Sequence, residues 1–265
     1  MKLFENGRVY RYDPGTQSYS RSPGFVVDGT LIASIDPGSA GAGTERIDLD
    51  GATVLAAFAD CHVHVTDTGY LLDERHLGAT RSYDDYCEAV LRLPSQRFVL
   101  AGNYDESEWL DGRLADAAPL ERGFPDSYAM LTRIDGHSCI VNRKTFAWLN
   151  LSAQAEGVQL DAGGVPTGKL SLSANWQAQA AFFAALPIEL KRAAEKRATD
   201  LALSHGALHL HAQLVGFRRD EYGREIDALR ALPAKWYPKI CEPDPELAYE
   251  LGLPFIGGDV FLDGS

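Results

Sequence analysis

The sequence predicts an α/β fold that follows a small β-rich N-terminal segment. From residue 53 onward, apolar stretches of strand length alternate with stretches of helical period, which is typical of a parallel sheet covered by helices. Residues 1–52 instead show turn signals and short apolar runs without a helical period. We therefore expect a small β domain over residues 1–52 and an α/β domain over residues 53–265.

The N-terminal segment contains two predicted hairpins. Residues 2–12 and 24–35 each surround an Asn-Gly or Asp-Gly pair. Such pairs readily adopt the positive φ values that two-residue hairpin turns require. The stretch between the two hairpins has the composition of a loop, and residues 46–49 are expected to add one more short strand.

The α/β part has six expected strands and six expected helices. The strands cover residues 53–65, 97–102, 128–133, 207–213, 235–241 and 254–262. The helices cover residues 82–93, 142–149, 175–185, 187–204, 219–231 and 244–251. Ser82 is a good N-cap, and Gly206 and Gly252 suit helix C-termini. Residues 152–174 form a long irregular piece, either a surface insertion or an active-site loop.

The strand over residues 53–65 carries the first chemical signal. It reads TVLAAFADCHVHV, an apolar run that we expect to be buried and that ends in His62 and His64. Residues i and i+2 of a strand point to the same face, so both imidazoles would leave one side together. Imidazole is the commonest protein ligand for zinc. The alternative is a chance His-x-His with one histidine hydrogen-bonded in a core.

Composition excludes several classes of function. The chain has 37 acidic and 25 basic residues, and its net charge of -12 argues against nucleic acid or anionic lipid as a partner. No apolar run reaches membrane-spanning length, and the N-terminus lacks the apolar core of a secretory signal. The four cysteines form no C-x-x-C pair. We therefore expect a cytoplasmic protein without membrane association.

Four stretches of the sequence, in order, resemble a known family. The first is the apolar strand that ends in D-x-H-x-H at residues 60–64. The others are RIDGHSCIVN at residues 133–142, VPTG at residues 165–168 and FLDGS at residues 261–265. Together they resemble the metal-dependent amidohydrolase superfamily, in the branch called amidohydrolase family 3. One departure is Ala56-Ala57, where this family usually has Pro-Gly.

The resemblance implies a TIM-like (β/α)8 barrel with an N-terminal β-sandwich segment. Six strands are two short of a closed barrel, so the barrel would be incomplete in this chain. The chain would then be the N-terminal part of a longer enzyme and would be inactive alone. In the family, the loop within residues 152–174 lies on the substrate side, which favours the active-site alternative. An open barrel exposes a sheet edge, so a homo-oligomer remains an open alternative.

The resemblance also implies a divalent metal, most simply one or two zinc ions. His62 and His64 are the expected ligands within this chain. The family's other ligands are a lysine carbamate or carboxylate and two histidines on later strands, and an aspartate takes the proton of the bound water. We expect most of these groups, including the catalytic ones, beyond Ser265. Asp259 occupies the position of the family's lysine, and it is either a metal ligand or a residue that orients one or caps a helix.

Further residues are candidates for contact with the substrate or for support of the metal ligands. Arg133, Asp135 and His137 lie within five residues just past a strand, although Asp135 is also a good helix-capping type. In the second His-x-His, residues 209–211, only His211 matches the family. Trp109 either lines a pocket or simply packs in the core.

These observations predict a metal-dependent hydrolase. The resemblance implies an amidohydrolase that cleaves a carbon–nitrogen bond other than a peptide bond in an amide-type small molecule. The same activated water would also attack an ester or lactone, which is the first alternative. The second alternative is a non-catalytic fragment that lacks the other half of the site.

Overall fold

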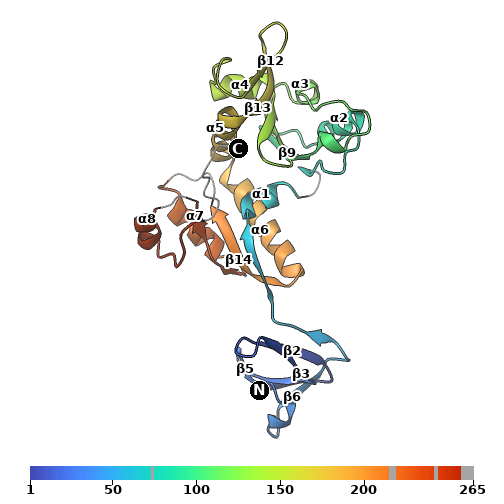
Figure 1. Ribbon diagram of the computed structural model, residues 1–265, viewed down its shortest axis with the longest axis vertical. Coiled ribbons are helices and arrows are strands. Elements are labelled where there is room, and N and C mark those ends of the chain that lie inside the picture. Colours follow the sequence, from blue (N-terminus) through green and yellow to red (C-terminus); the bar gives the residue numbers. More distant parts are fainter. Residues whose placement is uncertain (73–74, 215–218, 242–243, 258–265) are drawn as a thin grey trace. The chain divides into compact units, whose positions relative to one another are not determined.

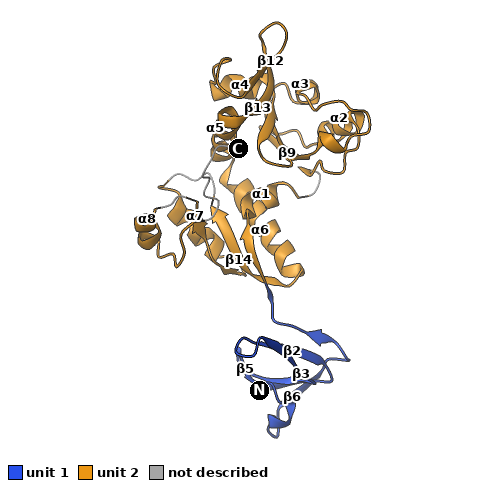
Figure 2. Cartoon of the chain, viewed as in Figure 1, with its two compact units in different colours: residues 1–58 blue, residues 59–265 orange. Residues whose placement is uncertain are grey.

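The computed structural model describes residues 1–72, 75–214, 219–241 and 244–257 (Figure 1). The chain divides into two compact units, Met1–Phe58 and Ala59–Ser265 (Figure 2). Strands and helices are mixed, so the predicted α/β fold class is confirmed. No helix within the described ranges combines the length and the apolar character that crossing a membrane requires.

The first unit contains strands in two small sheets and one turn of 3-10 helix, Pro37–Ser39. One sheet has the order β5-β4-β1-β6 and the other the order β3-β2-β7. The strands are β1 (Lys2–Glu5), β2 (Arg8–Asp13), β3 (Ser18–Ser22), β4 (Phe25–Asp28), β5 (Leu31–Ser34), β6 (Glu45–Asp48) and β7 (Thr53–Val54). Leu3 of β1 lies opposite Val26 of β4, and both are buried. Few side chains of this unit are buried as completely.

One of the two predicted hairpins is confirmed and the other is wrong. Strands β4 and β5 pair antiparallel, with Asp28 opposite Leu31 and Gly29 in the turn between them. Strands β1 and β2 do not pair with each other, because they belong to different sheets. Asn6 does adopt a positive φ of 60°, but its turn carries the chain from one sheet to the other. The predicted loop that follows β2 also contains a strand, β3, which pairs with β2.

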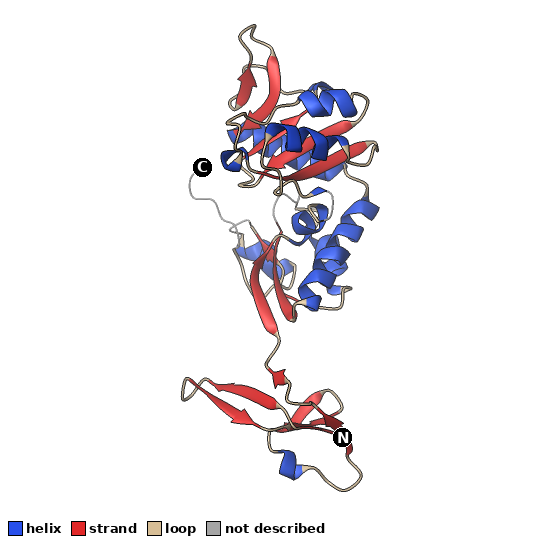
Figure 3. Ribbon diagram, turned by 90° about the vertical axis from the view of Figure 1, so that its right-hand side faces the viewer, coloured by secondary structure: helices blue, strands red, loops and turns tan. Residues whose placement is uncertain are grey.

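The second unit begins with a sheet of five strands in the order β12-β13-β11-β10-β9. Its strands are β9 (Phe98–Tyr104), β10 (Tyr128–Arg133), β11 (Ser138–Val141), β12 (Val158–Leu160) and β13 (Pro166–Ser171). Its helices are α2 (Tyr83–Leu91), α3 (Ala118–Gly123), α4 (Arg143–Leu149) and α5 (Leu172–Ala185). Helix α4 packs against β10 and helix α5 against β11 and β13. Figure 3 shows helices and strands mixed throughout the second unit. Only β9 and β10 pair in parallel.

A second sheet of this unit holds the strand that carries the histidine pair. Its strands are β8 (Phe58–Val63), β14 (Ala207–Leu214), β15 (Lys235–Trp236) and β16 (Lys239–Ile240). Strand β14 pairs with β8 and, in parallel, with β15 and β16. The accompanying helices are α1 (Val65–Tyr70), α6 (Ile188–Ser204), α7 (Tyr222–Arg230) and α8 (Pro245–Glu250). Apolar side chains of β14, α6 and α7, among them Leu210 and Ile226, form its core.

The prediction of one parallel sheet with six strands is wrong. The expected strands over residues 97–102 and 128–133 lie in the five-stranded sheet, apart from β8 and β14. This sheet is also not all parallel, because the turn at Gly136, with a φ of 72°, returns the chain from β10 into β11 as an antiparallel hairpin. A parallel sheet would require a helical crossover at that point. No sheet formed by the described residues closes into a barrel.

Three further predictions of local structure need correction. The expected strand over residues 53–65 is two strands, because the chain leaves the extended pairing between Val54 and Phe58. Residues 152–174 are not irregular, since they contain the antiparallel pair β12 and β13. The expected strand over residues 254–262 lies mostly outside the described residues, and its described part, 254–257, forms no strand.

Candidate metal site on strands β8 and β14

The two histidines of the first His-x-His lie side by side. His62 is on β8, and His64 follows the strand as the N-cap residue of helix α1. Their ring centroids are 5.3 Å apart with an edge-to-face angle of 67°. His62 is exposed and His64 is half-buried. Two imidazoles at this distance can approach the same ion.

The strand that carries them is less buried than expected. Leu55 and Phe58 are 51% and 58% exposed, so the prediction of a buried apolar run is wrong for the described structure. The break between β7 and β8 falls at residues 55–57, where Ala56-Ala57 replaces the Pro-Gly pair of the resembled family. Among the described strands, β8 has β14 as its neighbour in this sheet.

Helix α1 places a carboxylate beside His64. Asp67 lies in the first turn of α1 and interacts electrostatically with His64 and with Lys191 of α6. Burial raises the pKa of Asp67, and electrostatic interaction with His64 and Lys191 counteracts part of that rise. A carboxylate near a ligand histidine is a usual means of fixing the imidazole's orientation. No motif in the sequence pointed to Asp67.

The second His-x-His forms an aromatic stack with Tyr237. The His211 ring lies 4.6 Å from the Tyr237 ring, and His209 Nδ1 lies 3.1 Å from the Tyr237 hydroxyl. His211 Nδ1 is buried and has no hydrogen-bond partner among the described residues. Burial lowers the pKa of His211, as do Lys239 and His209, whereas the carboxylate of Asp60 on β8 opposes this. Strand pairing thus brings Asp60 and His211 into electrostatic contact.

Three further predicted residues, Arg133, Asp135 and His137, lie at the turn between β10 and β11 of the five-stranded sheet. Asp135 accepts a hydrogen bond at 2.9 Å from the backbone N–H of His137 and also pairs with Arg133. Two amides of α5, those of Asn175 and Gln179, donate to the carbonyl of Gly136 at 3.0 and 2.9 Å. The stretch of residues 133–142 is therefore a hairpin whose turn is fixed by polar contacts.

The end of β10 holds an ionic cluster that includes Glu106 and Lys169, which the sequence did not mark as site residues. Glu106 accepts hydrogen bonds from Arg133 Nε at 3.0 Å and from Lys169 Nζ at 3.1 Å. Its side chain is only 8% exposed. Asp105 is the N-cap residue of the 3-10 turn Glu106–Glu108. It also pairs with Arg133 at 3.1 Å. These residues come together only through the pairing of strands, so the local sequence does not predict the cluster.

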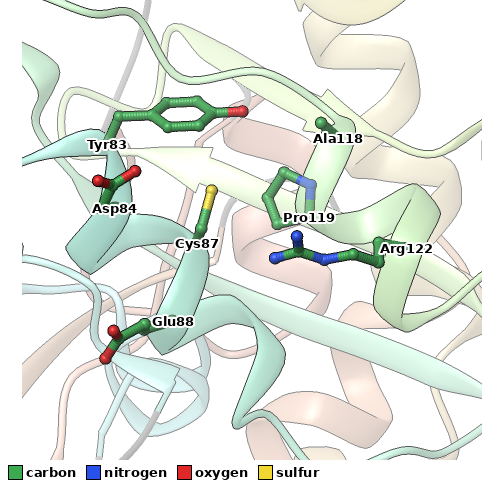
Figure 4. A pocket seen from close by; sticks show the side chains of 7 residues that line it. All are labelled: Tyr83, Asp84, Cys87, Glu88, Ala118, Pro119 and Arg122. Carbon is green, nitrogen blue, oxygen red and sulfur yellow. The ribbon is translucent and has the colours of Figure 1, made fainter.

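Trp109 lies in the core of this part of the structure. It is 6% exposed, and its ring packs against those of Tyr86 and Tyr83 at 5.3 and 6.4 Å. An open pocket of about 470 Å³ lies beside Tyr83 between α2 and α3 (Figure 4). Burial raises the pKa of Cys87 in this pocket, so its thiol is a weak nucleophile.

The described residues supply fewer ligands than a catalytic metal requires. They contain no group of three or more His, Cys, Asp or Glu side chains placed to hold an ion. Asp259 lies outside the described residues. A catalytic zinc usually has three protein ligands. His62 and His64 have suitable donor atoms and lie close together, so they fit two of those three positions.

Comparison with known proteins decides the family. A family model described as "Amidohydrolase family" matches residues 45–230, which is more than half of the chain. The chain belongs to the amidohydrolase family. The resemblance noted in its sequence is confirmed, and the matched region includes both His-x-His pairs and the hairpin that carries Arg133.

Two curated relatives share part of this amidohydrolase-family chain. Protein LONG AFTER FAR-RED 3 of Arabidopsis thaliana is 25% identical over 216 residues, which are 77% of this chain and 36% of that protein. Putative amidohydrolase YtcJ of Bacillus subtilis (strain 168) is 28% identical over 136 residues, which are 48% of this chain and 26% of YtcJ. The chain therefore spans about a third of the first relative and a quarter of the second.

Two solved structures share the fold. Both are uncharacterized metal-dependent hydrolases, one from Pyrococcus furiosus and one from Pyrococcus horikoshii OT3. The TM-scores are 0.69 and 0.67 at 23% and 22% identity. Each alignment covers 95% of this chain and about half of the other, 52% and 50%. At such identities the likeness establishes the fold.

Proposed function

We propose that this amidohydrolase-family chain belongs to a metal-dependent hydrolase and that His62 and His64 are metal ligands. The observation that carries the proposal is the 5.3 Å separation of their rings at the end of β8. The family assignment supports it. The substrate class we propose is an amide-type small molecule, cleaved at a carbon–nitrogen bond other than a peptide bond.

The metal-binding atoms of His62 and His64 are imidazole nitrogens, and they determine which metal the chain can bind. A bound divalent ion supplies Lewis-acid polarisation of a carbonyl and activation of water. Imidazole nitrogens suit zinc, which we propose as the metal. We retain Asp259 as the proposed third ligand within this chain. In the whole protein, we propose that β8, β14, β15 and β16 belong to a (β/α)8 barrel, a reading supported by the parallel pairing around β14.

We assign supporting roles to the other predicted residues. His211, stacked on Tyr237 and in electrostatic contact with Asp60, would face the substrate or orient a ligand. Arg133 and Asp135 would hold the hairpin turn that presents His137. Trp109 would support the same region from the core. We also propose a cytoplasmic location.

Zinc binding by the purified chain tests the ligand assignment. The metal-free protein is titrated with Zn²⁺ against a chromophoric chelator, for the wild type and for His62→Ala and His64→Ala. Each substitution removes a donor and is expected to weaken binding by more than about tenfold, the loss that even an outer partner of a ligand causes. His205→Ala removes an exposed histidine at the end of α6 and serves as the control.

The outcomes separate the proposal from its alternatives. Equal zinc affinity in wild type and both ligand variants would overturn the metal assignment. Turnover of a panel of amides by the zinc-loaded chain supports the proposed substrate class. Turnover of esters or lactones alone favours the first alternative, and zinc binding without turnover of either panel favours a non-catalytic fragment.

A further inference from the structure

Helix α1 is too short to be stable by itself. It has six residues, Val65–Tyr70, whereas isolated helices of fewer than about 12 residues are marginal in water. His64 is its N-cap residue, and the His64 carbonyl accepts a hydrogen bond from the amide of Thr68 at 2.9 Å. The backbone position of His64 is therefore tied to that of α1.

Helix α6 holds α1 at both ends. The guanidinium of Arg197 donates to the carbonyl of Gly69 through Nη2 at 2.8 Å and Nε at 3.2 Å. A cation at this end of a helix also interacts favourably with the helix dipole. At the other end, the hydroxyl of Thr66 donates to Oε1 of Glu195 at 3.4 Å. Figure 1 shows the two helices side by side.

At the Gly69 end the backbones of the two helices also meet directly. A Cβ added at Gly69 would lie 1.8 Å from the carbonyl oxygen of Ala194, a distance that no real contact allows. Gly69 is buried, and its φ is not in the left-handed region. Glycine is therefore required here for close approach rather than for its conformational freedom.

The Glu195 side chain, which accepts from Thr66, is itself fixed. Glu195 is 1% exposed, and its Oε2 pairs with Arg192 at 2.6 Å. Arg192 also pairs at 3.1 Å with Glu225 of α7, which in turn pairs with Lys191 at 2.8 Å. The α6 surface under α1 is thus a rigid polar support joined to α7.

We propose that Gly69, Glu195 and Arg197 are positioning residues for His64. They hold α1 packed against α6, and α1 in turn holds the His64 imidazole beside that of His62. The proposal rests on the proposed role of His64 as a metal ligand. Helix α6 would thus contribute to metal binding by His62 and His64, although it supplies no ligand itself.

The first test is a matched pair of glycine substitutions. Gly69→Ala inserts a methyl group between α1 and α6, whereas Gly223→Ala adds one in α7 where nothing lies within 4 Å. We expect Gly69→Ala to weaken Zn²⁺ binding about 10–100-fold, the usual cost of losing support for a ligand, and Gly223→Ala to leave it unchanged. Equal zinc affinity for wild type and Gly69→Ala would overturn the proposal.

Substitutions at Thr66 test the same proposal with less risk of unfolding the protein than Gly69→Ala carries. Thr66→Val keeps the shape of the side chain but removes the hydrogen bond to Glu195, and Thr66→Ser restores a hydroxyl. In ¹H–¹³C spectra of the metal-free protein, Thr66→Val should shift the imidazole signals of His62 and His64 and leave that of His137 in place. Thr66→Ser should return them toward the wild-type positions. Unshifted signals in Thr66→Val would contradict the proposal.

The two readouts separate this proposal from the one on which it depends. The imidazole signals are recorded without metal, so they report on the seating of α1 whether or not zinc binds. If His64→Ala does not weaken zinc binding, the metal assignment fails. If His64→Ala weakens it but Gly69→Ala and Thr66→Val do not, the metal assignment stands and the positioning role is refuted.

Discussion

Glu106 accepts a hydrogen bond from Nε of Arg133 at 3.0 Å, across the ends of two neighbouring parallel strands. Arg133 begins the stretch of residues 133–142 that resembles the family, and Glu106 lies outside every such stretch. The cluster at this strand end therefore depends on a partner that the motif does not contain. The stability of this strand end should therefore depend on Glu106.

Replacing Glu106 by Gln should destabilise the second unit. Arg133 and Lys169 would lose their shared, nearly buried acceptor charge, at a cost of about 1–3 kcal/mol. Glu88→Gln is the control, because its partner Arg92 is an exposed neighbour one turn along α2 and such pairs contribute less than about 1 kcal/mol. Urea unfolding measures both. Equal losses in the two variants would contradict the prediction.

Asn142 should tolerate no acidic replacement. It is buried, its side-chain oxygen caps α4 by accepting from the amide of Thr145, and its side-chain amide donates to the carbonyls of Phe124 and Ser127 at 2.8 and 2.9 Å. Asn142→Asp keeps the cap but places a carboxylate against two carbonyl oxygens. We expect a loss of about 3 kcal/mol or more in the free energy of unfolding. Asn142→Asp as stable as wild type in urea would refute this account.

The glycine of the VPTG stretch should be required for space as well as for conformation. Gly168 has a φ of 87°, and an added Cβ would lie 2.2 Å from the carbonyl oxygen of Val141. Gly164 has a φ of 77° with nothing within 4 Å, so Gly164→Ala isolates the conformational cost, roughly 1–2 kcal/mol. Gly168→Ala should lower the free energy of unfolding further than Gly164→Ala does. Thermal or urea unfolding of the two variants decides.

The buried carboxyl pair between α6 and α7 predicts a pH dependence of stability. Burial, and then the hydrogen bond with Glu225, raise the pKa of Glu195 from 4.5 to about 7. The folded state therefore holds a proton that the unfolded chain has released between these values. The stability from this group is complete below pH 4.5 and is lost as the pH rises to about 7.

The size of this pH effect on stability, and a control variant for it, follow from the same pKa. The shift corresponds to a loss of roughly 3 kcal/mol across that window. Glu195→Gln donates the same hydrogen bond to Glu225 without titrating, so this part of the pH dependence should disappear in the variant. Urea midpoints measured from pH 4 to pH 8 make the comparison. Parallel curves for wild type and variant would show that Glu195 does not carry the proton.

Local signals in the sequence predicted local structure well. The Ser82 side chain accepts from the amide of Asp85, as expected of the cap of α2, and five other helices lie where they were expected. The adjacency of His62 and His64 follows from their spacing. Pairing between distant strands was not predictable in this way. Whether β10 continues into a helix or returns as β11 depends on Gly136 adopting a positive φ and on α5 amides that hold its carbonyl.

The other missed features have the same origin. Strand β12 is short and mostly exposed, so it lacks the alternation that identifies a strand in sequence. Helix α1 depends on Arg197 and Glu195, more than a hundred residues further along the chain. Such contacts exist only once the tertiary structure has formed, and propensity carries no information about them.

The pairing of β8 with β14 also has a consequence for the order of events during synthesis. The five-stranded sheet lies entirely between these two strands in the chain, and its β10–β11 and β12–β13 pairs close over short loops. Strand β8 must wait until about 140 further residues have left the ribosome before its partner exists, and long-range pairing of this kind is slow. The nascent chain therefore displays the unpaired histidine strand, which begins at Phe58, until β14 has been synthesised. During that interval the strand is accessible to a chaperone that recognises extended apolar segments.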